Sequence, residues 1–261
     1  MRILSTTACT GRTFEEFLEI YQILKDPLNL QGLEVAIGIP FTIDDIPKIK
    51  QADIDTVIWH DAFWFLEGRK QETYPDTIAR YFELHALFSA NDINVPLWSI
   101  HPYKSHKPSA VWTDEIYSEF CQENWSNLEY VLPRDNVEDS DYYWQARDFM
   151  ICFENMLPTA PCYNNLQAVL DANVPFCIDY SHINIWTRNN REQTIIECLL
   201  ASRKASEIHL SHNNGRADSH DYIPSDAWFI PYLDLIEKKT RFITYESLPV
   251  EFRQYGRLDK K

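Results

Sequence analysis

Short apolar runs alternate with longer amphipathic segments along the whole chain. The apolar runs, which we interpret as strands, lie at residues 2–7, 33–39, 56–60, 95–101, 149–154, 175–179, 207–210 and 242–246. The amphipathic segments, which we interpret as helices, lie near residues 13–25, 43–51, 75–91, 114–130, 163–172, 191–204 and 226–239. Runs such as 176–178 are apolar without alternation, which is typical of parallel strands covered on both faces. Eight strands and seven helices in 261 residues predict an α/β fold, a single (β/α)8 TIM barrel, with a doubly wound sheet as the alternative.

The composition indicates a folded chain that forms one domain over residues 1–261. No Gly- or Ser-rich linker divides it, and 45% hydrophobic with 24% charged residues argue against a disordered or fibrous protein. The 24 basic and 39 acidic side chains give a net charge of −15, which argues against a broad nucleic-acid-binding surface. With only 6 glycines, the chain has no glycine-rich phosphate-binding motif.

The sequence also bears on the cellular compartment. It contains no apolar segment long enough for a secretory signal or a membrane span. Its 6 cysteines are dispersed and form no CxxC pair, which is typical of reduced, buried thiols in a chain of this length. We therefore expect a cytoplasmic protein that does not contact a membrane.

Six consecutive predicted strands, from the third to the eighth, end on or next to a histidine or a carboxylate. Together with residues in the loops that follow, these candidates are His60, His101, Glu154, Asp179, His182, His209, Asp218, His220 and Glu246. In a (β/α)8 barrel the carboxyl ends of all strands meet on one face, where catalytic residues lie. Imidazole and carboxylate groups bind Zn, Mn and Fe, and one tetrahedral ion takes only about four ligands. The pattern therefore predicts two or three divalent metal ions at this face.

Each candidate also has an interpretation without a metal. A single histidine at a strand end is more often a structural residue, and Asp218-x-His220 is compatible with an ordinary polar turn. The two strand-end glutamates are harder to explain in that way, because a buried carboxylate must be paired or must bind a cation. Alternation points the neighbouring Cys152 and Cys177 into the barrel or its wall, so we do not count them as ligands. The joint pattern is what favours a metal site.

Over residues 30–250 these motifs resemble the xylose isomerase-like TIM-barrel superfamily, in particular its endonuclease IV branch. The matching motifs are His60, His101-Pro102, Glu154-Asn155, Asp179-x-x-His182, His209-Leu210, Asp218-x-His220 and the final Glu246. The resemblance implies a trinuclear cluster. Its first ion would be held by His60, His101 and a bridging Glu154, its second by Glu154, Asp179, His209 and Glu246, and its third by His182, Asp218 and His220.

The resemblance leaves the reaction open. The endonuclease IV branch usually has Asn-Asp after His-Leu and Gly-x-Gly after Asp-x-His, whereas this chain has Ser211-His212 and, at residues 223–226, Ile-Pro-Ser-Asp. His212 could be an additional ligand. The second ligand group is also similar to the Glu-Asp-His-Glu site of the superfamily's sugar isomerases and epimerases. Multinuclear iron-dependent oxidases that modify peptides share the Glu-Asn and Asp-x-His motifs, but they usually have Asn where His182 stands.

Aromatic and basic residues near the predicted metal face indicate a substrate class. The aromatic candidates include Trp59, Trp64 and Trp98, which could stack on a sugar ring or simply pack in the barrel wall. The basic candidates, which could bind a phosphate or carboxylate, are Lys104, Arg188 and Arg216. Ordinary solvated loop charge is the alternative for these three.

Three functions are therefore considered. In the first, which we prefer, the protein is a sugar or sugar-phosphate isomerase or epimerase, in which a metal polarises a carbonyl and Glu154 or Glu246 moves the proton. The second is a multinuclear zinc phosphodiesterase that resembles endonuclease IV. The third is an iron-dependent oxidase, or a metal protein without catalytic activity, that needs a protein or peptide partner. Bound cations would make the local field positive, so the acidic net charge does not argue against a small anionic substrate.

Overall fold

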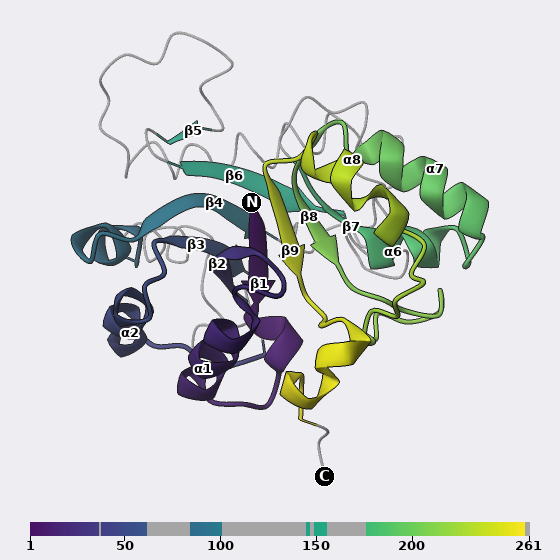
Figure 1. Cartoon of the computed structure of the whole chain (residues 1–261). Helices are drawn as coiled ribbons and strands as arrows, with labels where there is room; N and C mark the ends of the chain where they lie inside the picture. Colours follow the sequence, from purple (N-terminus) through teal and green to yellow (C-terminus); the bar gives the residue numbers. More distant parts are fainter. Residues whose placement is uncertain (37, 62–83, 101–144, 147–148, 156–175, 259–261) are drawn as a thin grey trace, which may run out of the picture.

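A curled parallel sheet forms the centre of the molecule (Figure 1). The computed structural model describes residues 1–36, 38–61, 84–100, 145–146, 149–155 and 176–258. Its parallel strands are β1 (Arg2–Ser5), β2 (Leu30–Val35), β3 (Thr56–Asp61), β4 (Asn94–Ile100), β6 (Phe149–Glu154), β7 (Phe176–Asp179), β8 (Ala205–Leu210) and β9 (Phe242–Tyr245). Each of them pairs with two others: β1 pairs with β2 and β9, and β4 pairs with β3 and β6. The short strand β5 (Gln145–Ala146) pairs antiparallel with β6.

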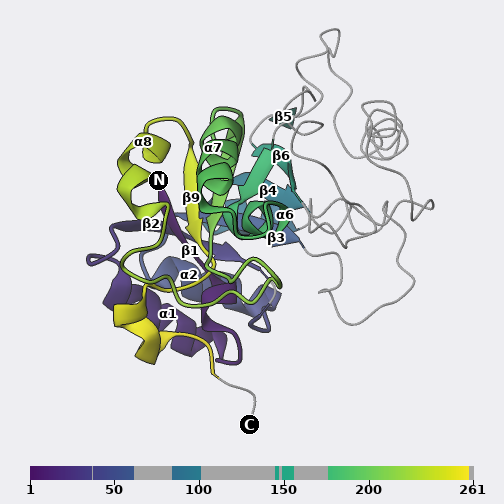
Figure 2. The same ribbon diagram turned by 90° about the vertical axis from the view of Figure 1, so that its right-hand side faces the viewer.

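Helices cover the outer side of this sheet (Figures 1 and 2). The α-helices are α1 (Phe14–Leu24), α2 (Ile46–Gln51), α6 (Tyr180–Trp186), α7 (Arg191–Ala201) and α8 (Leu233–Glu237), and residues 84–90 are also helical. The 3₁₀ helices are η1 (Thr6–Cys9), η2 (Ile43–Asp45), η4 (Ile230–Tyr232) and η5 (Val250–Tyr255). In the part of the chain that the structure describes, no helix is both long and apolar enough to cross a membrane.

Helix α1 illustrates how the local sequence sets an element. The hydroxyl of Thr13 accepts a hydrogen bond from the Glu16 N–H, and the Glu16 carboxylate accepts one from the Thr13 N–H. This reciprocal capping box satisfies two backbone donors that a helix start leaves free. The helix then buries Phe17, Tyr21 and Leu24, which recur at helical spacing and join the apolar core outside the sheet.

Alternation along the strands divides the core in two. One set of buried side chains, which includes Leu4 and Val57, packs against the helices. Their neighbours Ile3 and Ile58 point to the opposite face, because successive side chains in a strand alternate between the two faces of a sheet. A separate inner apolar cluster consists of Ile3, Ile58, Leu97, Cys152, Cys177 and Phe242. The curled sheet therefore has its own interior, distinct from the layer under the helices.

The structure confirms the predicted parallel α/β fold. The third and fifth predicted strands begin at the expected residues, whereas the second begins at Leu30 and ends at Val35 instead of spanning 33–39. Of the helix predicted over 75–91, residues 84–90 are described and helical, and the helices predicted over 114–130 and 163–172 lie outside the described residues. The segment predicted as one helix over 226–239 contains η4 and the shorter α8. Helix α6, which directly follows β7, is absent from the sequence prediction.

Candidate metal centre

The inner face of the sheet becomes polar toward the carboxyl ends of its strands. Ile58 and Cys152 belong to the inner apolar cluster, and the residues two positions later are His60 and Glu154. Residues two apart in a strand share a face, so both histidine and glutamate are directed into the same interior. Further buried polar side chains come from the other strands or from the residues that directly follow them. They are Glu34, Asp179, His209 and Glu246. These six side chains are all 5% exposed or less.

Glu154 lies at the centre of this group. Its Oε2 is 3.1 Å from Nε2 of His60, and its Oε1 is 3.6 Å from Nδ1 of His209 and 3.5 Å from Nδ1 of His182. Glu246 Oε1 is 3.5 Å from the same Nδ1 of His209. One carboxylate therefore contacts three imidazoles that come from different elements, as a bridging ligand would have to do.

The Asp-x-x-His motif forms a second part of the site at the start of α6. Asp179 is the N-cap of this helix, and its Oδ1 accepts hydrogen bonds from the N–H groups of Ser181 and His182 at 2.5 and 3.0 Å. Asn155 fixes the same motif, because its Oδ1 accepts from the Asp179 N–H at 2.6 Å and its carbonyl oxygen lies 2.5 Å from His182 Nδ1. The Asn that follows Glu154 thus joins the fifth parallel strand, β6, to the sixth, β7.

The loop after β8 completes the site. Asp218 Oδ2 lies 3.3 Å from Nε2 of His182 and 3.1 Å from Nε2 of His220, and Asp218 Oδ1 accepts a hydrogen bond from the Ser181 hydroxyl at 3.0 Å. Nδ1 of His220 is 3.7 Å from Glu246 Oε2. Eight of the nine predicted ligands therefore form one connected network, and the ninth, His101, lies outside the described residues.

Two buried carboxylates in this region are absent from the sequence prediction. Glu34 of β2 is 0% exposed, and its Oε2 lies 3.2 Å from His209 Nε2 and 3.5 Å from His60 Nδ1. Glu207 of β8 is also 0% exposed, and its Oε2 lies 3.5 Å from His209 Nε2. Both were overlooked because the prediction considered only strand ends, although a glutamate inside an apolar strand is itself a signal. We call the eight described ligand candidates with Glu34 and Glu207 the polar network.

Charge governs the protonation of the polar network. It contains six carboxylates and four histidines among the described residues. Burial lowers the pKa of His60, but the charge of Glu34 and contact with Glu154 outweigh it, so that the pKa is raised well above its usual value. Burial also lowers the pKa of His209, but the charges of Cys177, Glu246 and Glu34 outweigh it and raise the pKa well above its usual value. The metal-free network therefore favours protons on its histidines, and these are the positions that cations would replace.

The pKa values of Glu34 and Glu246 are shifted in opposite directions. Burial would raise the pKa of Glu34, but the charges of His209 and His60 outweigh it and hold the pKa well below the usual range. Burial raises the pKa of Glu246 to about 8, although His209 and His220 oppose this. Two glutamates of one site thus differ in proton affinity, a pattern found where one carboxylate stays charged and another exchanges a proton.

The donor set fits divalent metal ions. Four groups of three or four ligand atoms lie within 4.8 Å of one another: Glu34, His60, His209, Glu246; Cys177, Glu207, His209; Glu154, Asp179, His209; and Asp179, His182, Asp218. Buried atoms such as Asp179 Oδ2, both ring nitrogens of His209 and Glu246 Oε2 make no hydrogen bond within the described residues. Buried polar atoms are nearly always satisfied, so these atoms indicate a ligand that binds here. Mixed nitrogen and oxygen donors suit Zn, Mn or Fe.

The structure places some predicted substrate residues and not others. Trp64 and Lys104 lie outside the described residues. Arg188 follows α6 and Arg216 follows β8, and both are exposed. Their loops touch, because a Cβ on Gly215, which has a φ of 75°, would meet the Cβ of Asn189 at 2.6 Å. The two arginines therefore belong to adjoining loops that follow the ligand-bearing elements.

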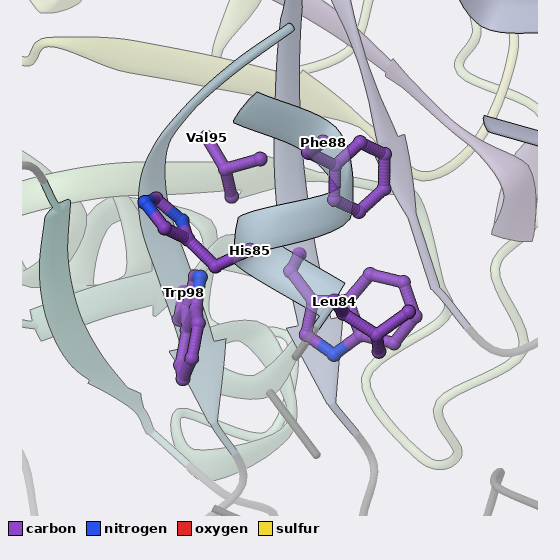
Figure 3. Close-up of a pocket in the computed structure, with 6 residues that line it drawn as sticks. Leu84, His85, Phe88, Val95 and Trp98 are labelled. Atoms are coloured by element: carbon purple, nitrogen blue, oxygen red, sulfur yellow. The ribbon is translucent and has the colours of Figure 1, made fainter. Parts of the chain in front are cut away.

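The tryptophans Trp59 and Trp98 pack in the wall of the sheet, which is the alternative interpretation of these residues. Both are buried in the outer core, with Phe88 of the helical segment 84–90. Figure 3 shows Trp98 next to His85 in a small pocket that Leu84, Phe88 and Val95 also line, and the ring centroids of His85 and Trp98 are 6.2 Å apart. Because Trp59 directly precedes His60, alternation directs the two side chains to opposite faces.

His212 belongs to none of the four ligand groups found among the described residues. Its backbone instead pairs with that of Asp221, whose N–H donates to the His212 carbonyl at 2.7 Å. Burial lowers the pKa of His212.

The comparisons with known proteins identify the fold. No known protein-family profile matches the sequence, and no curated protein matches it. Similar solved structures include a D-tagatose 3-epimerase-like protein, which is 14% identical with a TM-score of 0.57 over 97% of this chain and 92% of that chain. The IOLI protein, solved with a binding zinc atom, is 12% identical with a TM-score of 0.55 over 97% and 91% of the two chains.

A third similar structure is the probable 3-DHS dehydratase AsbF involved in petrobactin synthesis from Bacillus anthracis. It is 11% identical with a TM-score of 0.57, over 97% of this chain and 95% of that chain. At these identities the similarity concerns the fold alone. It confirms, for the fold, the resemblance to xylose isomerase-like TIM-barrel proteins.

Proposed function

We propose that this protein is a metal-dependent (β/α)8 enzyme that isomerises or epimerises a small sugar or sugar-phosphate-like substrate. The observation that carries the proposal is the position of Glu154, whose carboxylate contacts His60, His182 and His209 in a buried site. A buried carboxylate surrounded by imidazoles is an arrangement that binds divalent cations well. Two or three ions of Zn, Mn or Fe would be held by the predicted ligands, including His101.

A complete barrel is the architecture that this proposal requires. It is supported by eight parallel strands that each pair with two neighbours, including the pairing of β4 with β6. It is also supported by the polar network at the carboxyl ends of the strands, where the active sites of such barrels lie. We propose a single domain over residues 1–261 for the same reason.

In the proposed reaction the chain itself moves the proton. A bound divalent ion would supply Lewis acidity and polarise an oxygen of the substrate. Glu154 and Glu246 both approach His209 Nδ1, at 3.6 and 3.5 Å, and so lie close to the same ligand position. One of these two carboxylates would accept the proton from a substrate carbon and return it to the product. Because both carboxylates are buried, solvent water would be kept away from the group that carries the transferred proton.

Three of the similar structures support the substrate class only by analogy. One is an epimerase-like protein, one contains zinc, and one is a probable dehydratase, according to their descriptions. Arg188 and Arg216, with Trp64 and Lys104, would bind the sugar or its anionic group, since their predicted loops open on the metal face. The cytoplasmic location stays a prediction.

The first test is the metal content of the purified chain. We expect elemental analysis to find two or three divalent ions per chain. We expect Glu154→Gln to lower metal affinity by more than the roughly 100-fold that loss of an outer partner costs, because it removes the bridging carboxylate. The exposed Glu251→Gln is the matched control, and it should bind metal as the parent does. A parent chain that binds no metal would contradict the proposal.

The second test follows the proton. Incubation of the metal-loaded enzyme with ketoses, aldoses and their phosphates in deuterated water should place deuterium on a substrate carbon, as detected by NMR. Glu154→Gln and Glu246→Gln should each abolish this exchange. Metal binding without exchange on any of these compounds would leave the metal site intact and contradict the isomerase assignment.

A phosphodiesterase is the second candidate, because the separate ligand group of Asp179, His182 and Asp218 would suit a multinuclear zinc site that stabilises both oxygens of a phosphodiester. In that case two or three Zn ions would accompany hydrolysis of phosphodiesters, and sugars would not exchange protons. Iron with oxygen consumption would instead identify the third candidate, an oxidase with a peptide partner.

A further inference from the structure

The buried side chain of Glu34 contacts two of the candidate metal ligands, His60 and His209. Its side chain is 0% exposed, so the charge of its carboxylate has to be balanced by groups inside the protein. Its Oε2 is 3.2 Å from Nε2 of His209 and 3.5 Å from Nδ1 of His60. A buried glutamate therefore faces one nitrogen of each of two imidazoles.

The other ring nitrogens of these two histidines face the opposite way. Nε2 of His60 is 3.1 Å from Glu154 Oε2, and Nδ1 of His209 is 3.6 Å from Glu154 Oε1. Each ring thus presents one nitrogen to Glu154 and the other to Glu34, while Glu246 Oε1 lies 3.8 Å from Nδ1 of His60 and 3.5 Å from Nδ1 of His209. In a neutral imidazole one nitrogen carries the proton and the other accepts or binds a metal.

We propose that Glu34 is a positioning residue that accepts the N–H of both His60 and His209 and so selects the nitrogens that bind metal. This inference rests on the proposed function. It predicts that His60 binds through Nε2 and His209 through Nδ1. Histidine ligands generally donate their second N–H to a carboxylate, carbonyl or water, which fixes the tautomer and the ring orientation. Here a single carboxylate would serve two ligands on strands β3 and β8.

Glu34 could in principle bind a metal itself, since it forms a ligand group with His60, His209 and Glu246. The nitrogens closest to Glu34 Oε2 are Nδ1 of His60 and Nε2 of His209, and a metal on Glu34 would use these two. If Glu154 also holds a metal with these residues, both rings would have to lose both N–H protons, whereas a neutral imidazole offers one acceptor nitrogen. The positioning role needs no such deprotonation and is therefore favoured.

Glu207 strengthens this assignment on the His209 side. Its Oε2 lies 3.5 Å from the same Nε2 of His209, while its Oε1 accepts a hydrogen bond from the Thr244 hydroxyl. Nε2 of His209 therefore faces two buried carboxylates. Nδ1 of the same ring faces Glu154 and Glu246, which are the predicted metal ligands. The geometry therefore assigns the proton to Nε2, beside Glu34 and Glu207, and the metal to Nδ1.

The tautomers can be measured on the parent protein. In the zinc-loaded chain labelled with ¹⁵N-histidine, long-range ¹H–¹⁵N spectra should show a proton on Nδ1 of His60 and on Nε2 of His209. His60→Gln and His209→Gln spectra would assign the two signals. Metal coordination through Nδ1 of His60 or Nε2 of His209 would overturn the proposal, and this result requires no Glu34 variant to fold.

Substitution of Glu34 measures the consequence. Glu34→Gln should bind the same number of zinc ions at saturation, but with about 10- to 100-fold lower affinity in competition with a chelator. Glu34→Asp should recover part of the affinity, and Glu251→Gln should not change it. Unchanged affinity in Glu34→Gln, or loss of one ion at saturation, would overturn the positioning role. A parent chain without zinc would instead contradict the proposed function.

Discussion

Two layers of side chains inside the same sheet have opposite chemistry. The inner apolar cluster and the polar network are carried by the same strands, and on β3 and β6 they are separated by only two residues, as Ile58 and His60 or Cys152 and Glu154 illustrate. The inner apolar cluster consists of buried apolar side chains in contact, whereas the polar network brings six carboxylates together with four histidines.

The difference between the layers separates stability from function. Burying an apolar side chain contributes roughly 1.5–3 kcal/mol to folding, whereas a buried charge costs free energy unless it is paired or binds a cation. The apolar layer is therefore expected to hold the strands together. The polar network is expected to weaken the metal-free fold and to gain its stability from bound ions.

The largest expected effect concerns the apolar layer. Leu97→Ala should lower the free energy of unfolding by about 2–5 kcal/mol, because Leu97 is 0% exposed and its removal leaves a cavity. Urea denaturation of the metal-free chain measures this. The control is Leu87→Ala, since Leu87 is 40% exposed and should change stability by no more than about 0.5 kcal/mol. Equal losses in the two variants would contradict the assigned role of the apolar layer.

An intermediate effect is expected where the two layers meet. The Thr244 hydroxyl donates a hydrogen bond to Glu207 in the buried interior. Thr244→Val keeps the shape but removes the donor, and it should cost roughly 1.5–3 kcal/mol, as expected for a hydrogen bond to a charged group. In a double-mutant cycle, the same substitution should cost much less in a Glu207→Leu background. Full additivity of the two substitutions would show that the contact does not stabilise the fold.

The smallest expected effect concerns the polar network without metal. Glu246→Gln removes one of six carboxylates that face four histidines, while Gln keeps the volume of the side chain. Thermal unfolding of the metal-free variant near pH 7 should show unchanged or higher stability, because burial disfavours the charged form of Glu246 and raises its pKa to about 8. Metal affinity should fall in the same variant. A clear loss of metal-free stability would mean that Glu246 is a structural residue.

The strands and most ligand candidates could be predicted from local patterns. Unalternated apolar runs marked the parallel strands, and the polar residues that end them marked the site, because parallel strands bring their carboxyl ends together. Helix α6 was missed because it has only 7 residues and follows β7 without a loop. Asp179 caps this helix, so one residue serves both as a predicted ligand and as a helix start.

Glu34 shows the limit of this approach. It precedes Val35, the last residue of β2, whereas the predicted strand continued to residue 39 and so placed no polar residue at its end. The alternation that assigns Trp59 to the wall and His60 to the interior was available in the sequence. That Glu34 meets His60 and His209 was not, because the contact depends on how strands β2, β3 and β8 are arranged around the interior.

The sequence by itself determined the alternation of strands and helices, the acidic character of the chain and the types of metal ligand, since these follow from side-chain chemistry and short-range spacing. Only the tertiary structure decided which ring nitrogen of each histidine faces which carboxylate and which buried glutamates share one interior. Those relations join residues that are far apart in the chain, such as Glu34 and His209. They arise when the sheet curls, and no local pattern encodes the resulting distances.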